Sequence, residues 1–394
     1  MADRRDIPLA LYVHIPWCER KCPYCDFNSH ERYDPADQLD YVGALIHDLE
    51  LQLEGFNTPP LHSIFIGGGT PSLFSGEAIA TLMEGIDKRW PIGSSTEVTL
   101  EANPGSAEAA RFAAYRAAGI NRLSLGIQSF DDHHLQSLGR VHSAAQAQAA
   151  VTQADRHFSR FNIDLMHGLP NQTPEQAVAD LRQALASGSG HISWYQLTVE
   201  PNTAFWSRPP RLPGDDLLAD IQDAGAHELS QAGLNQYEVS AWALRNQEAQ
   251  HNLNYWRFGD YLGIGAGAHG KLSRPEGSIE RTQRTRAPAD YLSAIKERQP
   301  PRRNTIPATE LPVEFMLNAL RLREGVPLQL FESRTGLSTE SVARIIDDLQ
   351  SRGLLSVQGG VLRTTPTGFN FLNDVLARFI PPGHRASAIP LLEE

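Results

Sequence analysis

Three cysteines are the whole thiol content of this 394-residue chain, and all of them fall within eight consecutive positions. An odd number of thiols in so short a stretch cannot build a disulfide framework, which excludes the class of small cross-linked secreted domains. Free thiols gathered in this way usually hold a metal. The scarcest residue type is therefore the first indication of function.

Long apolar runs and an excess of basic residues are also missing. No run approaches the ~18 apolar residues of a membrane span, so we expect no integral membrane protein. Residues 1–7 carry mixed charges and His14 and Pro16 interrupt the apolar stretch that follows, so we expect no signal peptide and a cytoplasmic location. The net charge of −11 argues against nonspecific binding of nucleic acid.

The cysteines Cys18, Cys22 and Cys25 are spaced Cys-x3-Cys-x2-Cys. Structural zinc needs four ligands, and with no second cysteine pair the site would have to borrow His14, His30 or a distant histidine. A [4Fe–4S] cluster fits better, because each of three thiolates takes one iron corner. The fourth iron then stays open to a substrate or cofactor.

Six apolar or β-branched runs alternate with stretches of helical spacing, which predicts an α/β fold with a parallel sheet, either open or closed into a partial barrel. The runs are Leu9 to Ile15, Ser63 to Ile66, Glu97 to Glu101, Arg122 to Gln128, Phe161 to His167 and His191 to Val199. The helical stretches between them are 37–53, 77–90, 107–118, 144–157 and 173–186.

Polar or glycine-rich segments follow every run, where a parallel barrel places its active site. The cysteines follow the first run, and the later segments are 67–71, 101–104, 126–130, 164–170 and 195–201. Core packing alone does not explain six polar segments at one end of a sheet. We therefore expect the functional site at the carboxyl ends of these strands.

We expect three parts in the chain: the barrel over 1–205, an extension and linker over 206–300, and a C-terminal domain over 301–394. The C-terminal part predicts two helices, a hairpin over 354–363 and a final helix from Pro366, in the manner of a winged helix. Residues 310–380 contain seven basic and eight acidic side chains. DNA binding requires basic charge, so we expect an α+β lid or partner-binding domain instead.

The cysteine spacing, with the aromatic Tyr24 directly before the last cysteine, resembles the radical S-adenosylmethionine (SAM) family. The segment from Tyr12 to Cys18 is similar to the branch that contains oxygen-independent coproporphyrinogen III dehydrogenase and its HemW-type relatives. The resemblance implies a partial (βα)6 barrel, a [4Fe–4S] cluster on the three cysteines and SAM on the free iron. In that family, one-electron reduction cleaves SAM to methionine and a 5′-deoxyadenosyl radical.

Taken singly, each candidate SAM contact is explained as well by a tight turn or a solvated charge. The family resemblance implies a joint role in which the glycine segment receives the methionyl amino group, the carboxylates receive ribose hydroxyls or the ammonium, and an arginine pairs with the SAM carboxylate. The residues matching that pattern are Tyr12, Tyr24, Gly68, Gly69, Thr70, Glu101, Gln128, Arg140 and Asp164.

A second distinctive segment reads His-Asn-x-x-Tyr-Trp over residues 251–256 and is followed by a glycine-rich stretch over 263–270. From residue chemistry, the imidazole either ligates a porphyrin iron or belongs to a polar network that supports the barrel mouth. The motif resembles that of the HemW-type haem chaperones, which implies haem as cargo and His251 as its axial ligand.

Two departures separate the chain from the dehydrogenase. Asp26 and Phe27 follow the third cysteine where that enzyme has Cys-x-Cys, and only eleven residues precede Tyr12 where it has a longer extension. The resemblance therefore implies a haem chaperone that serves apo-haemoproteins, among them membrane respiratory enzymes contacted transiently. The alternative is oxidative decarboxylation of coproporphyrinogen III. Whether SAM is turned over stays open, and a cluster-dependent homodimer is implied by analogy only.

Overall fold

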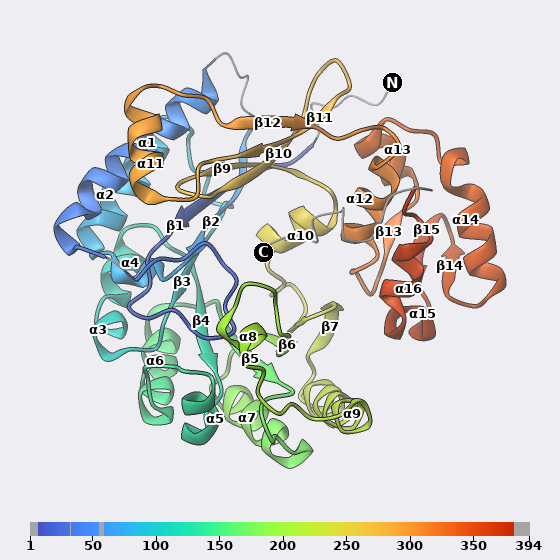
Figure 1. The fold of residues 1–394 in the computed structure, drawn as a ribbon, viewed down its shortest axis with the longest axis horizontal. Helices are drawn as coiled ribbons and strands as arrows, with labels where there is room; N and C mark the ends of the chain where they lie inside the picture. The colour runs from blue at the N-terminus through green and yellow to red at the C-terminus, as the bar shows by residue number, and fades with distance from the viewer. Residues whose placement is uncertain (1–6, 32, 55–58, 382–394) are drawn as a thin grey trace.

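The computed structural model describes residues 7–31, 33–54 and 59–381. Six parallel strands pair in chain order and curve into an open barrel with helices on its outer side (Figure 1). The strands are β1 (Leu9–Ile15), β2 (Leu61–Gly68), β3 (Glu97–Ala102), β4 (Arg122–Gln128), β5 (Phe161–His167) and β6 (His191–Gln196). The helices between and after them are α1 (Gln38–Leu53), α2 (Gly76–Asp87), α3 (Ser106–Ala109), α4 (Phe112–Ala117), α5 (Asp132–Ser137), α6 (Ala144–His157), α7 (Pro174–Ala186), α8 (Ala204–Ser207) and α9 (Asp215–Gln231).

Further strands extend both edges, so the sheet described has twelve strands in the order β12-β11-β10-β9-β1-β2-β3-β4-β5-β6-β8-β7. One edge is formed by β9 (Asp260–Ile264), β10 (His269–Ser273), β11 (Ile279–Gln283) and β12 (Arg302–Thr305), the other by β7 (Asn235–Glu238) and β8 (Ala241–Ala243). Strand β9 runs parallel to β1, while β8 runs antiparallel to β6. Helix α11 (Pro288–Lys296) lies against α1.

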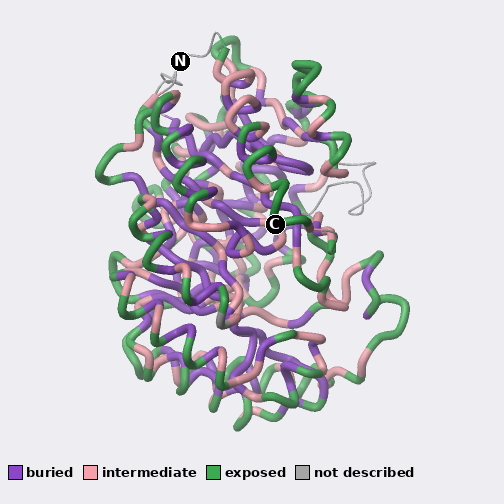
Figure 2. The backbone as a smooth tube through the Cα atoms, turned by 90° about the vertical axis from the view of Figure 1, so that its left-hand side faces the viewer, coloured by how far each residue is buried: buried purple, intermediate pink, exposed green. Residues whose placement is uncertain are grey.

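Side-chain alternation gives the curved sheet two different faces. On β3, Val98 and Leu100 belong to the apolar core that also contains residues of the outer helices. Glu97, Thr99 and Glu101 alternate with them and face the barrel interior. The barrel interior is polar because the apolar residues of each strand point toward the outer helices, and the residues that alternate with them point inward. In Figure 2 buried backbone runs through the middle of the molecule, and exposed backbone lies mostly at its outer edge.

Local capping fixes where helix α6 begins. The Ser143 hydroxyl accepts the Gln146 N–H, and the Gln146 side chain accepts the Ser143 N–H at 2.9 Å. Such a capping box satisfies two N–H groups that have no partner inside the helix and stabilises it by about 1 kcal/mol. The helix consequently begins at the first residue of the stretch predicted over 144–157.

The C-terminal domain shares an apolar core with residues that precede it, such as Leu253, Trp256 and Phe258, and has a three-stranded sheet in the order β13-β15-β14. Its elements are α12 (Leu311–Ala319), β13 (Val326–Pro327), α13 (Gln329–Thr335), α14 (Glu340–Ser351), β14 (Leu355–Gln358), β15 (Val361–Thr364), α15 (Pro366–Asn370) and α16 (Leu372–Ala377). In Figure 1 the domain lies opposite α1 and α2, beside α10 (Gln250–Trp256). The predicted α/β barrel with a C-terminal α+β domain is confirmed.

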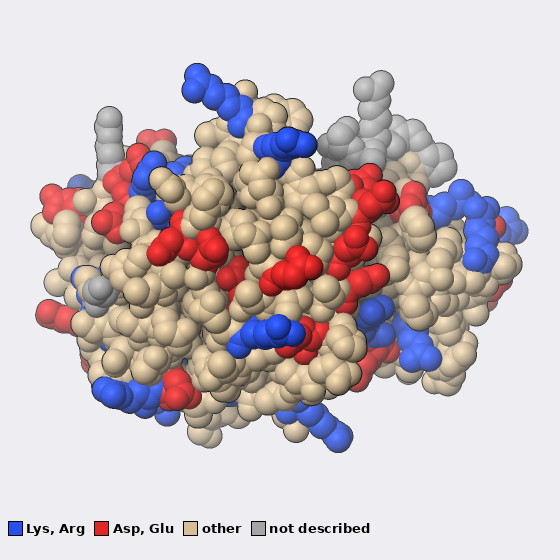
Figure 3. Space-filling view, turned by 90° about the horizontal axis from the view of Figure 1, so that it is seen from below, with Lys and Arg blue, Asp and Glu red and all other residues tan. Residues whose placement is uncertain are grey.

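Acidic side chains gather in the middle of the face seen from below, with basic ones scattered around them (Figure 3). Helix α9 has two acidic residues, Asp215 and Asp216, in its first turn. Across residues 7–31, 33–54 and 59–381, no helix has the length and apolar character needed to cross a membrane.

Candidate functional site

The three cysteines lie on the loop between β1 and α1, here called the cysteine loop (residues 16–34). Backbone hydrogen bonds close it: the Cys18 N–H donates to His30 O at 3.0 Å, and the Cys25 N–H donates to Cys22 O at 3.1 Å. All three thiols are free and partly exposed. Burial raises the pKa of Cys18, and it raises the pKa of Cys25 to about 11. The described residues include no set of three acidic, histidine or cysteine side chains that converges on one metal ion.

Two polar side chains reach the cysteine sulfurs, Thr70 from the segment after β2 and Arg140 from the segment between α5 and α6. The Arg140 guanidinium donates to Cys22 Sγ at 3.4 Å, and the Thr70 hydroxyl donates to Cys18 Sγ at 3.5 Å. Asn103 connects the two, because its Oδ1 accepts from Arg140 at 2.7 Å and its Nδ2 donates to Thr70 at 3.2 Å. Arg140 also donates to Gly126 O on β4 at 2.8 Å, so these contacts join the ends of β2, β3 and β4 to the cysteine loop.

The glycine segment after β2 lies directly against β1 and the cysteine loop. A Cβ at Gly68, whose φ is +114°, would lie 2.5 Å from the His14 ring, and one at Gly69 would lie 2.5 Å from Trp17 O. The Gly68 N–H donates to Glu101 at 3.0 Å. No residue with a side chain fits at these two positions without displacing β1 or the loop, so the glycines are required by close approach.

Gln128 ends β4 with a φ of +69°, a left-handed conformation that is unfavourable for a residue other than glycine. The Tyr195 hydroxyl donates to its Oε1 at 2.7 Å and holds the side chain in place. Strain of this kind costs about 1–3 kcal/mol and concentrates at functional sites. Gln128 is therefore held in a strained conformation at the carboxyl end of β4.

Asp164 and Tyr12 lie one layer deeper, at the middle of β5 and β1. Asp164 accepts from Asn162 at 2.7 Å and from Ser124 at 3.1 Å, and burial raises its pKa. The Tyr12 hydroxyl donates to His14 Nδ1 at 3.0 Å, while His14 Nε2 donates to Asn28 O at 2.9 Å. Tyr12 therefore reaches the cysteine loop through His14.

Tyr24, in the loop itself, is close to Arg140. Burial raises the pKa of its phenol, and the nearby Arg140 charge opposes that rise. Its ring centroid lies 6.4 Å from that of Phe205, whose N–H donates to Pro23 O at 2.9 Å. Helix α8 is therefore anchored against the cysteine loop.

His251 lies away from the cysteines, at the amino-terminal end of β2 and β3. It is 1% exposed, with Nδ1 2.9 Å from Ser63 Oγ and Nε2 2.8 Å from Tyr255 Oη, while its backbone N–H donates to Glu97 at 3.1 Å. Burial lowers the pKa of its imidazole to about 3. An iron ligand needs a free ring nitrogen, and both are engaged in this arrangement.

The sequence reasoning missed several residues that complete this site. Asn103 and Tyr195 stood inside the polar segments after the third and sixth runs, so their position was a usable signal. No sequence signal pointed to Asn28. Its Nδ2 donates to Ala266 O and to Arg286 O, both at 2.9 Å. The glycine-rich stretch over 263–270 thus supports the cysteine loop.

Residues 12–184 match the model described as "Radical SAM superfamily", and residues 306–371 match "HemN C-terminal domain". The structure titled coproporphyrinogen III oxidase (HemN) from Escherichia coli shares the fold, with a TM-score of 0.80 at 21% identity over 95% of this chain and 90% of that one. The fold and the motif together define a radical SAM protein.

Curated relatives refine this assignment. The chain is 51% identical to the protein named heme chaperone HemW of Haemophilus influenzae and 47% identical to that of Escherichia coli, over 95% of this chain and 98% of each relative. A Bos taurus protein named radical S-adenosyl methionine domain-containing protein 1, mitochondrial, is 36% identical over 93% of this chain and 86% of its own length. The chain belongs to the HemW family of the radical SAM superfamily.

Superfamily membership implies a [4Fe–4S] cluster and SAM, and the chain supplies the donor types that these groups need, three thiols and several polar side chains. The three free thiols share one loop, and two donors already point at their sulfurs. Arg140 Nε and Thr99 Oγ1 are buried without a hydrogen-bond partner in the described structure. Buried polar atoms are rarely left unpaired, so these two mark the barrel interior as a place for a polar ligand.

Proposed function

We propose that this chain is a cytoplasmic haem chaperone that carries a [4Fe–4S] cluster and SAM and transfers haem to apo-haemoproteins. The observation that supports it most is similarity over nearly the full length to proteins named heme chaperone HemW. Asp26 and Phe27, in place of a Cys-x-Cys ending, point the same way.

In this proposal, Cys18, Cys22 and Cys25 hold the cluster. The proposed SAM-binding residues come from the cysteine loop, the barrel strands and the segments that follow them, and are Tyr12, Tyr24, Gly68, Gly69, Thr70, Glu101, Gln128, Arg140 and Asp164. A bound cluster with SAM supplies one-electron chemistry. The protein's own contribution is to hold Arg140 and Thr70 at the sulfurs and to enclose the ligand in a polar barrel interior.

Haem is the cargo, and the partners are apo-haemoproteins, including membrane respiratory enzymes met transiently. A homodimer that depends on the cluster is part of the proposal. His251 is a candidate haem ligand only if one ring nitrogen gives up its contact with Ser63 or Tyr255, because these two hydroxyls engage both nitrogens in the structure.

The second candidate is oxidative decarboxylation of coproporphyrinogen III. The fold shared with the structure titled coproporphyrinogen III oxidase favours it, since the barrel and the C-terminal domain are common to both. The cysteine loop distinguishes the candidates, because it lacks the fourth cysteine of that enzyme.

One set of cysteine variants tests both the iron–sulfur cluster and the transfer of haem. After anaerobic reconstitution, we expect about three to four irons per chain, as three cysteines can hold one four-iron cluster. Cys18→Ser, Cys22→Ser and Cys25→Ser are each expected to lose most of the iron and the transfer of haem to an apo-acceptor, read from the acceptor's absorption spectrum. One zinc per chain, or transfer that survives all three substitutions, would contradict the proposal.

A further inference from the structure

A carboxylate lies in the apolar face of α7. The buried residues of this helix are Ala177, Asp180, Leu181 and Ala184, so an acid occupies one position of an otherwise apolar stripe. Asp180 is only 3% exposed, and burial raises its pKa to about 6. A buried acid is unfavourable unless hydrogen bonds compensate for the lost water. The contacts of Asp180 therefore indicate which part of the structure depends on it.

Both oxygens of Asp180 accept hydrogen bonds from the turn that follows β4. The Ser129 hydroxyl donates to Oδ2 and the Phe130 N–H donates to Oδ1, each at 2.7 Å. The Ser129 oxygen in turn accepts the Asp131 N–H at 3.1 Å. Ser129 is 0% exposed and Phe130 is buried, so water does not replace these contacts. One carboxylate thereby holds three consecutive residues, 129–131.

This turn connects two of the proposed SAM contacts. Gln128 lies directly before it with a φ of +69°, a conformation that a residue other than glycine keeps only where its surroundings enforce it. Asp131 caps the amino-terminal end of α5 with its side chain. The segment after α5 carries Arg140, which donates to Cys22 Sγ at 3.4 Å. A shift of the turn would therefore displace both Gln128 and Arg140.

We propose that Asp180 is a positioning residue of the SAM site. By holding the turn over 129–131, it keeps Gln128 in its strained conformation and keeps α5 where Arg140 reaches the cysteine loop. The inference rests on the proposed function and gives a role to a residue of an outer helix. Without the carboxylate, the Ser129 hydroxyl and the Phe130 N–H would be buried without a partner, which favours rearrangement of the turn. Bound SAM would then have to restore the conformation of Gln128.

SAM binding to the cluster-reconstituted protein, measured by equilibrium dialysis with labelled SAM, tests this role. Asp180→Ala is expected to raise the Kd about tenfold, which corresponds to about 1.4 kcal/mol, because SAM must supply the cost of the strained conformation. The iron content is expected to stay at the wild-type level, since the three thiols are untouched. This split between affinity for SAM and iron content distinguishes a positioning role from damage to the cysteine loop.

Two milder variants grade the effect. Asp180→Asn keeps an acceptor for the Phe130 N–H and offers a donor to the Ser129 oxygen, so its Kd is expected to stay within about threefold of the wild-type value. Ser129→Ala leaves the carboxylate in place but removes one of its two partners. It is expected to raise the Kd about threefold, so the test does not depend on whether Asp180→Ala folds.

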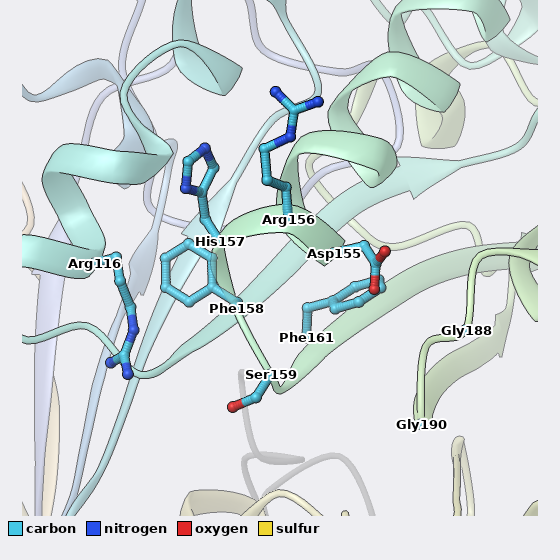
Figure 4. A pocket seen from close by; sticks show the side chains of 9 residues that line it. All are labelled: Arg116, Asp155, Arg156, His157, Phe158, Ser159, Phe161, Gly188 and Gly190. Atoms are coloured by element: carbon cyan, nitrogen blue, oxygen red, sulfur yellow. The ribbon is translucent and has the colours of Figure 1, made fainter.

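Two controls separate positioning from general effects on stability and charge. Leu181→Ala opens a cavity in the same face of α7, so it is expected to destabilise the fold but to keep the Kd within about twofold. Asp155→Ala removes an exposed carboxylate from α6 at the opposite end of the barrel, where Asp155 lines a cavity of about 410 Å³ (Figure 4). It matches the charge lost in Asp180→Ala without touching the turn, so wild-type affinity is expected.

Amide hydrogen exchange in the cluster-free protein gives a readout that needs no cofactor. The Phe130 N–H is expected to exchange slowly in the wild type and in Asp180→Asn, because an oxygen at residue 180 accepts it. In Asp180→Ala its exchange is expected to be at least about tenfold faster, since the turn opens locally.

The outcomes separate this role from the proposed function. Wild type that binds neither iron nor SAM refutes the proposed function itself. Wild type that binds SAM, with Asp180→Ala and Ser129→Ala as tight as wild type, overturns the positioning role alone. Equal weakening by Leu181→Ala or Asp155→Ala also overturns it, because the effect is then one of stability or charge. Slow exchange of the Phe130 N–H in Asp180→Ala overturns it as well, because the turn then holds without the carboxylate.

Discussion

Replacement of His251 by alanine is expected to destabilise the barrel strongly, because this histidine joins α10 to strands β2 and β3. Its ring contacts Ser63 on β2 and Tyr255 on α10, and its N–H donates to Glu97 on β3. Alanine removes the imidazole from the buried Ser63 hydroxyl and from the half-buried Tyr255 hydroxyl, and it opens a cavity. Each buried group left unpaired costs about 1–3 kcal/mol, so we expect a loss of about 3–5 kcal/mol in the free energy of unfolding.

Urea denaturation followed by far-UV circular dichroism measures this loss. His227→Ala is the matched control, since His227 is exposed on α9 and its replacement should change stability by less than about 0.5 kcal/mol. Haem titration of the same two variants, below the denaturation range, completes the experiment. A His251→Ala protein as stable as wild type that loses the Soret shift of bound haem would refute the structural reasoning and establish His251 as a ligand.

Two further predictions concern acid stability and the cysteine loop. Burial lowers the folded-state pKa of several histidines below the unfolded value of about 6.5. Below pH 6.5 the unfolded chain therefore binds more protons than the folded chain. The free energy of unfolding should fall as the pH drops from about 6.5 toward 4, by up to about 1.4 kcal/mol per pH unit for each histidine. The histidines are His14, His142 and His167, each with a pKa of about 4, and His251, with a pKa of about 3. Burial raises the pKa of Asp180 to about 6, and this acid opposes the loss of stability because its folded form binds the proton more readily. Urea midpoints that are unchanged between pH 7 and pH 5 would contradict the predicted loss of stability. Gly267→Ala should lower the reconstituted iron content, because its Cβ would lie 2.3 Å from Asn28 Nδ2 in the cysteine loop. Gly277→Ala is the control and should retain the iron, because Gly277 also has a positive φ but no neighbour within 4 Å. Equal iron content in the two variants would show that the contact with Asn28 is unimportant.

Much of the barrel followed from sequence because its signals are local. Strands β1, β4 and β5 begin and end at the predicted residues, since a buried strand between helices is recognised by its own composition. Strand β2 extends further than predicted, through Gly67 and Gly68, because glycines that read as a turn still pair with β1. Strand β6 ends at Gln196 rather than Val199.

Long-range placement was beyond the reach of the same reasoning. The contact between His251 and Ser63 joins residues 188 positions apart, and no periodicity reports that α10 packs against β1 and β2. The sequence motif raised two interpretations of His251, and only three-dimensional contacts show both ring nitrogens engaged. The support of Asn28 by Ala266 is of the same kind, at a separation of 238 residues.

The central claim is that the chain carries haem rather than making its precursor. Cluster-reconstituted protein incubated anaerobically with SAM, a reductant and coproporphyrinogen III tests it most directly, with haem binding measured on the same preparation. The account predicts bound haem and no protoporphyrinogen, because the cysteine loop lacks the fourth cysteine of the dehydrogenase. Release of carbon dioxide with formation of protoporphyrinogen over repeated turnovers would contradict it.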